Sequence, residues 1–204
     1  MFAVIKRIAQ LILNLGTIRM SQTKNIIAID KRFNETFRFD GKEMPATFRR
    51  QPEWVFVVTY RKFQENRNNI VGAYYRRKLA AIERKTGIHI ENNPNFGKGL
   101  IIGHYGRIII NGSVKFGDQI YIPHGVTIGR NAVGKRKGTP VIGNRVRIGA
   151  NATIVGNVHI GNDVMIAPNA FVNIDVPDHS VVVGNPCMIH HKDNATKGYL
   201  GEID

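Results

Sequence analysis

Two histidines in the middle of the sequence have the residue type and setting for proton-transfer chemistry. His104 follows the run GLIIG, and His124 comes twenty residues later within IPHG. Histidine titrates near neutral pH, and as a general base it can accept the proton of an alcohol that attacks an activated carbonyl, typically a gain of about 10²–10⁴-fold in rate. We predict His104 as the catalytic base and His124 as a weaker candidate. The alternative for each is a structural histidine that bonds a neighbouring carbonyl.

The charge balance points to an anionic partner. The chain has 204 residues, with 29 Lys and Arg against 15 Asp and Glu, and a formal net charge of +14. Such a balance attracts nucleic acid, lipid head groups, a phosphorylated cofactor or an acidic polymer. Aromatic and cationic residues alternate at 74–78, but no zinc-ligand spacing, recognition helix or ribonucleoprotein motif accompanies them. Neither nucleic acid nor a metal ion is therefore expected.

The elements that must position the histidines are visible as a six-residue repeat. Between residues 141 and 176 an aliphatic side chain recurs at every sixth position, namely Ile142, Ile148, Ile154, Ile160, Ile166 and Val172. A period of six fits neither an α-helix nor a simple strand, and it indicates a solenoid. The predicted fold class is mainly β: a parallel β-helix of hexapeptide repeats, three hexads per triangular coil, preceded by an N-terminal helical region.

The repeat is broken at two places. Counting back from Ile128 in steps of six leads through Ile122 and Phe116 to Ile110, but the next step reaches His104, while Ile102 sits two residues early. Downstream, Ile128 and Ile142 are fourteen residues apart where we expect twelve, across a segment that contains Lys135, Arg136 and Lys137. Solenoids use corner insertions for binding. The two breaks therefore mark the predicted functional surface.

The remaining chain divides into an N-terminal helical region (1–86), the β-helix (87–190) and a C-terminal tail (191–204). Residues 53–85 have the periodicity of a helical hairpin, whereas 21–52 have no firm period and are predicted to connect. Residues 1–20 form a basic amphipathic pattern that can lie on an anionic membrane surface or dock on the protein or a sister subunit. No apolar run reaches the roughly 18 residues of a membrane span, and the single Cys187 suits a reducing compartment. We expect a cytoplasmic protein, with peripheral membrane contact through residues 1–20 as an option.

From about Gly87 to Ile189 the chain resembles the hexapeptide-repeat acyltransferases, in particular the serine acetyltransferase-like branch that includes surface-polysaccharide O-acetyltransferases. The motifs that carry the resemblance are GLIIGHYG at 99–106, GVTIG at 125–129, IGA at 148–150, VPDH at 176–179 and GNPC at 184–187. The resemblance implies a left-handed coil, a homotrimer with active sites between subunits, and acetyl-CoA as the donor. It also implies direct attack by the acceptor hydroxyl without an acyl-enzyme, and it places His104 on the family's catalytic histidine.

The resemblance also implies residues that would hold CoA. Cations can bind its phosphates through charge-assisted hydrogen bonds, and backbone amides beside small residues contact its pantetheine arm. Pro168, one coil after Ala150, has no N–H to offer. The candidate CoA-binding residues are Gly129, Lys135, Arg136, Lys137, Arg145, Arg147, Ala150 and Lys192.

The acceptor is predicted from departures from the family pattern. Serine acetyltransferases resemble this chain but have an aspartate where it has Gly103, another where it has His89, and a second histidine near Thr139. The nearest remaining carboxylate is Glu91, a weak candidate to orient His104 alongside a backbone carbonyl. Without the two acids, the ammonium group of free serine lacks a partner, whereas a sugar hydroxyl needs none.

The predicted function is therefore acetylation of a sugar hydroxyl in a bacterial surface polysaccharide, such as capsule or O-antigen. The basic charge favours an acidic or phosphate-containing carbohydrate acceptor. Two alternatives stay open: a serine O-acetyltransferase of cysteine biosynthesis, and a non-catalytic hexapeptide-repeat binding protein.

Overall fold

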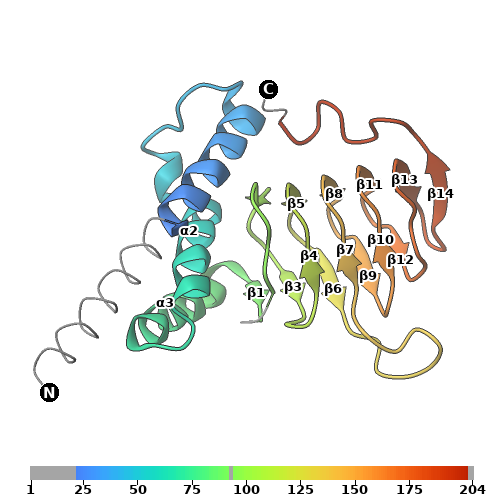
Figure 1. Ribbon diagram of the computed structural model, residues 1–204, viewed down its shortest axis with the longest axis horizontal. Helices are drawn as coiled ribbons and strands as arrows, with labels where there is room; N and C mark the ends of the chain where they lie inside the picture. Colours follow the sequence, from blue (N-terminus) through green and yellow to red (C-terminus); the bar gives the residue numbers. More distant parts are fainter. Residues whose placement is uncertain (1–21, 92–93, 202–204) are drawn as a thin grey trace, which may run out of the picture.

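The molecule is a three-sided parallel β-solenoid whose N-terminal end is covered by helices (Figure 1). The computed structural model describes residues 22–91 and 94–201. The predicted amphipathic segment 1–20 lies outside these residues. In the described part of the chain, no helix has the length and apolar character needed to cross a bilayer.

The helical layer consists of a helix over residues 22–39, a short 3-10 helix η1 (Phe48–Arg50), α2 (Pro52–Glu65) and α3 (Ile70–Thr86). The first of these helices lies where the sequence predicted an irregular connection. Its inward positions include the polar residues Asp30 and Asn34, which are buried to 0% and 2% exposure. Because buried polar residues interrupt the apolar stripe of this helix, hydropathy alone missed it.

Three parallel sheets form the sides of the coil. One contains β1 (Ile88–Ile90), β3 (Ile108–Ile110), β6 (Thr127–Gly129), β9 (Thr153–Val155) and β12 (Phe171–Val172). A second contains β2 (Ile101–Ile102), β5 (Ile120–Ile122), β8 (Val146–Ile148), β11 (Val164–Ile166), β13 (Ser180–Val183) and β14 (Met188–His191). The third contains β4 (Lys115–Phe116), β7 (Val141–Ile142) and β10 (His159–Ile160). Among the named strands of the described ranges, β14 alone pairs antiparallel, with β13, and so closes the stack.

The hexapeptide positions stack in columns inside the prism. On the first sheet Ile110 pairs with Ile128, Ile128 with Ile154, and Ile154 with Val172. All four side chains have 0% exposure. Burying such side chains contributes about 1.5–3 kcal/mol each, so the repeat alone supplies a continuous core.

Both breaks of the repeat are corners that have been lengthened. Ile102 pairs with Ile122, and Ile110 pairs with Ile128. The chain therefore uses eight residues from Ile102 to Ile110 in the first coil, where the next coil uses six from Ile122 to Ile128. The extra two residues fall in the corner 103–107, hereafter the His104 corner.

The second break is larger than the sequence suggested. Phe116 pairs with Ile142 on the side that follows Ile110 and Ile128, so Ile128 and Ile142 lie on successive sides. A regular coil separates such residues by six positions. The segment at 130–140, hereafter the basic loop, therefore adds eight residues rather than two, and it projects from the coil between β6 and β7 (Figure 1).

A buried ion pair fixes the helices to the first coil. Arg61 on α2 donates to both carboxylate oxygens of Asp30, at 2.8 and 3.1 Å. Asp30 Oδ1 also accepts the backbone N–H groups of Gly99 and Leu100, at 2.8 and 3.1 Å. Burial raises the pKa of Asp30, which Arg61 and these amides oppose. This network holds α2 at the strand that leads into the His104 corner.

The C-terminal segment after β14 runs back along the coil toward the helices (Figure 1). Asp163 anchors it, because the carboxylate accepts the N–H groups of Ala195 and Thr196 at 2.9 and 3.0 Å and the Thr196 hydroxyl at 2.6 Å. The segment then reaches the helix 22–39, where Gly201 lies against the backbone of Phe37.

Candidate active site

His104 projects from the two-residue expansion of its corner, and its side chain is 71% exposed. The α2 helix brings a carboxylate to it: Glu53 Oε1 lies 3.3 Å from His104 Nδ1. The Glu53 side chain is only 8% exposed, and the same oxygen accepts the backbone N–H of Tyr105 at 3.2 Å. An exposed imidazole is therefore backed by a buried carboxylate, an arrangement suited to general base catalysis.

Local sequence explains why Glu53 stands there. Gln51 is the N-cap of α2 and Pro52 opens the helix, so Glu53 falls in the first turn, where the helix dipole favours an anion. Arg38, from the helix 22–39, donates to the carbonyl oxygens of Ile102 and Gly103. Burial lowers the pKa of Arg38, and the Glu53 carboxylate opposes that shift. The corner is thus held from two helices.

The second histidine lies on the corner of the next coil. The ring centroids of His104 and His124 are 6.3 Å apart. Both line a groove of about 330 Å³ that continues along the six-stranded face past Arg147, Gly149 and Ala150. The two catalytic candidates therefore share one site.

Small residues shape this groove. In the described part of the chain the Ala150 N–H donates to no backbone carbonyl, so it is available to a ligand. The equivalent position one coil later is Pro168, which lines the same groove but has no N–H. A ligand amide or carbonyl can thus bond the backbone at Ala150 and only pack against Pro168.

A tyrosine occupies the space beside Gly103. A Cβ on Gly103 would lie 2.3 Å from the Tyr121 hydroxyl oxygen, so any side chain at this position would collide with that ring. Tyr121 in turn stacks under Arg147, whose guanidinium carbon is 4.4 Å from the ring centroid. Arg147 also donates to the Tyr199 carbonyl of the C-terminal segment at 3.1 Å. These contacts hold the Arg147 guanidinium at the groove.

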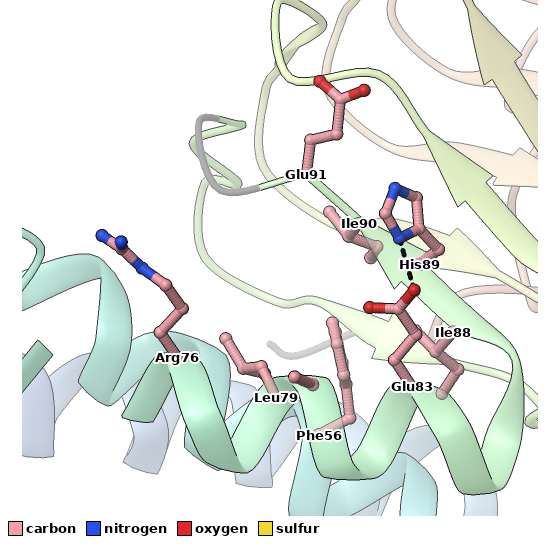
Figure 2. A pocket seen from close by; sticks show the side chains of 9 residues that line it. Phe56, Arg76, Leu79, Glu83, Ile88, His89, Ile90 and Glu91 are labelled. Carbon is pink, nitrogen blue, oxygen red and sulfur yellow. Dashed lines mark hydrogen bonds and ion pairs between the residues drawn. The ribbon is translucent and has the colours of Figure 1, made fainter. Parts of the chain in front are cut away.

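Two positions considered as partners of His104 lie elsewhere. His89 points into a separate cleft of about 520 Å³ between α3 and β1, where its Nδ1 is 2.7 Å from Glu83 Oε1 (Figure 2). Glu91 lines this same cleft (Figure 2). Its carboxylate accepts the N–H of Gly112 at 2.6 Å. The structure does not bring Glu91 to His104.

The predicted CoA-binding residues are spread over several corners of one protomer. Arg147 and Ala150 lie in the His104 groove. Arg136 pairs with Asp175 at 2.7 Å, in the basic loop that also contains Lys135 and Lys137. The other candidates do not line the groove: Gly129 ends β6, Arg145 borders a cavity beside Asp163, and Lys192 follows β14.

Sequence reasoning missed Glu53 and Tyr121. Glu53 is 51 residues from His104 in the chain, and it belongs to a helix whose docking the six-residue repeat does not describe. A proline followed by a glutamate predicts where a helix begins, but not which part of the protein that helix packs against. Tyr121 occupies an outward strand position, where the repeat imposes no residue type.

Comparison with known proteins shows which proteins the chain resembles. Residues 139–173 match the model "Bacterial transferase hexapeptide (six repeats)". The chain is thus similar to the hexapeptide-repeat transferases over part of its coil. A serine acetyltransferase of Helicobacter pylori is 40% identical over 108 residues, which are 53% of this chain and 63% of that protein. One from Staphylococcus aureus is 34% identical over 146 residues, covering 71% of this chain and 66% of that protein. The chain thus spans somewhat less than two thirds of these relatives.

Solved structures of serine acetyltransferases share the fold. Neisseria gonorrhoeae serine acetyltransferase, in complex with serine, aligns with a TM-score of 0.72 at 24% identity over 86% of this chain and 72% of that one. A serine acetyltransferase complexed with CoA aligns with a TM-score of 0.72 at 20% identity over 83% of this chain and 70% of that one. The predicted left-handed β-helix with N-terminal helices is confirmed.

These relatives overturn the predicted acceptor. The expectation of a polysaccharide hydroxyl, and with it a role in capsule or O-antigen synthesis, is wrong, because the curated relatives and solved neighbours are serine acetyltransferases. The prediction assumed that acidic groups had to stand at positions 89 and 103. The fold instead brings Glu53 to the site from the helical layer.

Proposed function

We propose that this hexapeptide-repeat protein transfers the acetyl group of acetyl-CoA to the hydroxyl of serine. The observation that carries the proposal is the exposed His104 imidazole, backed by the buried Glu53 carboxylate at one end of a groove with a free backbone N–H. Its serine acetyltransferase relatives support the acceptor.

The residues present support a direct transfer. His104 Nε2 accepts the proton of the serine hydroxyl while the hydroxyl oxygen attacks the thioester carbonyl carbon. The tetrahedral intermediate collapses as the carbon–sulfur bond breaks, and the imidazolium returns the proton to the thiolate of CoA. No acyl-enzyme is needed, since the attacking group belongs to the acceptor.

The groove has the properties that an acetyl-CoA arm requires. Gly149 and Ala150 leave it unobstructed, and the Ala150 N–H can donate to a pantetheine carbonyl. Arg147, which lines the groove together with His104, is our candidate for the carboxylate of serine. We therefore expect cations outside this groove to bind the CoA phosphates.

We propose a homotrimer, because the cations that would bind the CoA phosphates lie outside the His104 groove of a single protomer. Lys135 and Lys137 lie in the basic loop, on a different corner from His104 in the same protomer. A neighbouring subunit packed against the groove would supply a second wall and bring its own basic loop to the CoA phosphates. The family resemblance favours this arrangement.

The test is release of CoA from acetyl-CoA by the full chain with L-serine, followed as free thiol. His104→Ala should lower kcat by about 10²-fold or more, because His124, the other histidine of the groove, has no carboxylate partner among the described residues and is the weaker base candidate. His89→Ala is the matched control: this exposed histidine also pairs with a carboxylate, but it lies in the other cleft (Figure 2). Its activity should stay within about twofold of wild type.

Two outcomes would overturn the proposal. Near-normal turnover in His104→Ala would remove histidine as the base. Absence of serine-dependent thiol release in the wild-type protein would reject serine as the acceptor.

A further inference from the structure

We propose that Glu53 is a positioning residue that fixes the ring orientation and tautomer of His104, so that the helical layer is part of the active site. The kinetic half of this inference rests on the proposed function. The structural half concerns only the protonation pattern of one imidazole.

The geometry singles out Glu53. Its Oε1 lies 3.3 Å from His104 Nδ1, and no other carboxylate in the described ranges pairs with this ring. The separation is slightly longer than an ordinary N–H···O hydrogen bond, as is common in unliganded catalytic sites that tighten when substrate binds. A carboxylate can only accept, so the proton of a neutral His104 belongs on Nδ1. Nε2 is then left with the lone pair that a base requires.

The carboxylate is itself held in place. Glu53 Oε1 also accepts the Tyr105 N–H, so a single oxygen contacts both the imidazole and the backbone of the next residue. Glu53 Oε2 is buried and has no hydrogen-bond partner, so the contacts that hold this carboxylate at the corner run through Oε1. The expanded corner is thereby pinned at the point where it departs from the repeat.

The two positions at which the resembled serine acetyltransferases have an acid are occupied differently here. His89 is occupied with Glu83, in the cleft beside α3. An acidic side chain at Gly103 would collide with Tyr121. The carboxylate that lies beside His104 comes instead from outside the coil, on α2.

The test compares Glu53→Ala and Glu53→Gln with Glu83→Gln as the matched control, since Glu83 likewise sits beside a histidine Nδ1 but in the other cleft. In ¹⁵N-histidine-labelled full-length protein above pH 8, wild-type His104 should show the Nδ1–H tautomer. Glu53→Ala should shift its signals toward a mixture of tautomers. Glu53→Gln retains an acceptor oxygen and should keep most of the Nδ1–H form.

The kinetic prediction is a loss in kcat with little change in KM. Glu53→Ala should lower kcat about 10–100-fold, with the KM for acetyl-CoA within about threefold, and Glu53→Gln should lie between it and wild type. Glu83→Gln should change neither quantity by more than about twofold. A merely structural role for Glu53 would lower thermal stability without moving the tautomer.

The outcomes separate this inference from the proposed function. If Glu53→Ala folds and keeps the wild-type tautomer, the inference is overturned whatever the activity. If Glu53→Ala does not fold, Glu53→Gln decides: a kcat below that of wild type together with a reduced share of the Nδ1–H form supports the inference, and a wild-type kcat with an unchanged tautomer overturns it. If neither wild type nor any variant transfers acetyl to serine, but substitution of Glu53 changes the His104 tautomer, the proposed acceptor is rejected and the positioning role of Glu53 is supported.

Discussion

Gly103 shows how a single small residue decides where the chemistry of the site comes from. The serine acetyltransferase pattern resembled by this chain has an aspartate at that position, and here the Tyr121 ring fills the space. Tyr121 also supports Arg147, with its ring 4.4 Å below the guanidinium. In this chain, therefore, position 103 has no acid, Arg147 is a fixed cation in the groove, and α2 supplies the carboxylate.

Asp163 carries the pH dependence of the C-terminal segment. Burial by itself would raise the pKa of this carboxylate, but hydrogen bonds from the Thr196 hydroxyl and N–H, from His179 and from Ala195 outweigh it and lower the pKa from 3.8 to about 2. A lowered pKa contributes stability above the unfolded value, and this is lost as the pH falls from about 4 to about 2. A shift of this size corresponds to about 2 kcal/mol.

We therefore expect Asp163→Asn to lower the free energy of unfolding at pH 7 by about 2 kcal/mol or more, because an amide cannot accept all of these hydrogen bonds. Between pH 4 and 2 the stability of wild type should fall more steeply than that of the variant. Urea denaturation across this range measures both effects. Asp40→Asn, at an exposed turn, is the control and should follow the wild-type curve; identical slopes for Asp163→Asn would contradict the prediction.

At the scale of elements, the basic loop is a fixed structure attached to the coil. Asn131 and Gly138 exchange two backbone hydrogen bonds of 2.9 and 3.0 Å across its base. The Arg136 guanidinium pairs with Asp175, and the Arg136 backbone carbonyl accepts the N–H of Asn157, so this residue attaches the loop to the coil. Lys135 and Lys137 are exposed, and within the described residues they have no ion-pair partner.

The double variant Lys135→Ala/Lys137→Ala should therefore raise the KM for acetyl-CoA about 3–30-fold, through loss of charge-assisted contacts to phosphate, with kcat within about twofold. Thermal stability should not change. Arg84→Ala/Lys85→Ala removes two exposed cations from the end of α3 and should leave KM unaltered. An unchanged KM in the loop variant would assign phosphate binding to other cations.

At the scale of the whole molecule, the charge is concentrated away from the coil. Residues 1–87 contain 18 Lys and Arg against 7 Asp and Glu, a net +11, and residues 88–204 contain 11 against 8, a net +3. Most of the +14 therefore belongs to the helical region rather than to the faces that would bind CoA. Net charge was for that reason a poor guide to the acceptor.

The proposed trimer makes a direct prediction for the assembled molecule. With a subunit of 22.9 kDa, light scattering coupled to gel filtration should give a mass about three times that value. Dilution to concentrations at which the trimer dissociates should abolish acetyl transfer, because the basic loop and the groove would then lie on separate molecules. A fully active monomer would contradict shared sites.

The sequence alone determined the coil, because a column of aliphatic residues at every sixth position has one solution that buries them all: Ile110, Ile128, Ile154 and Val172 stack at zero exposure as the repeat requires. It also located His104, since a polar residue that breaks such a column has to leave it. The partner of His104 was decided only by the tertiary structure. Glu53, Tyr121 and the buried Asp30–Arg61 pair act through contacts between distant segments, which no local period records.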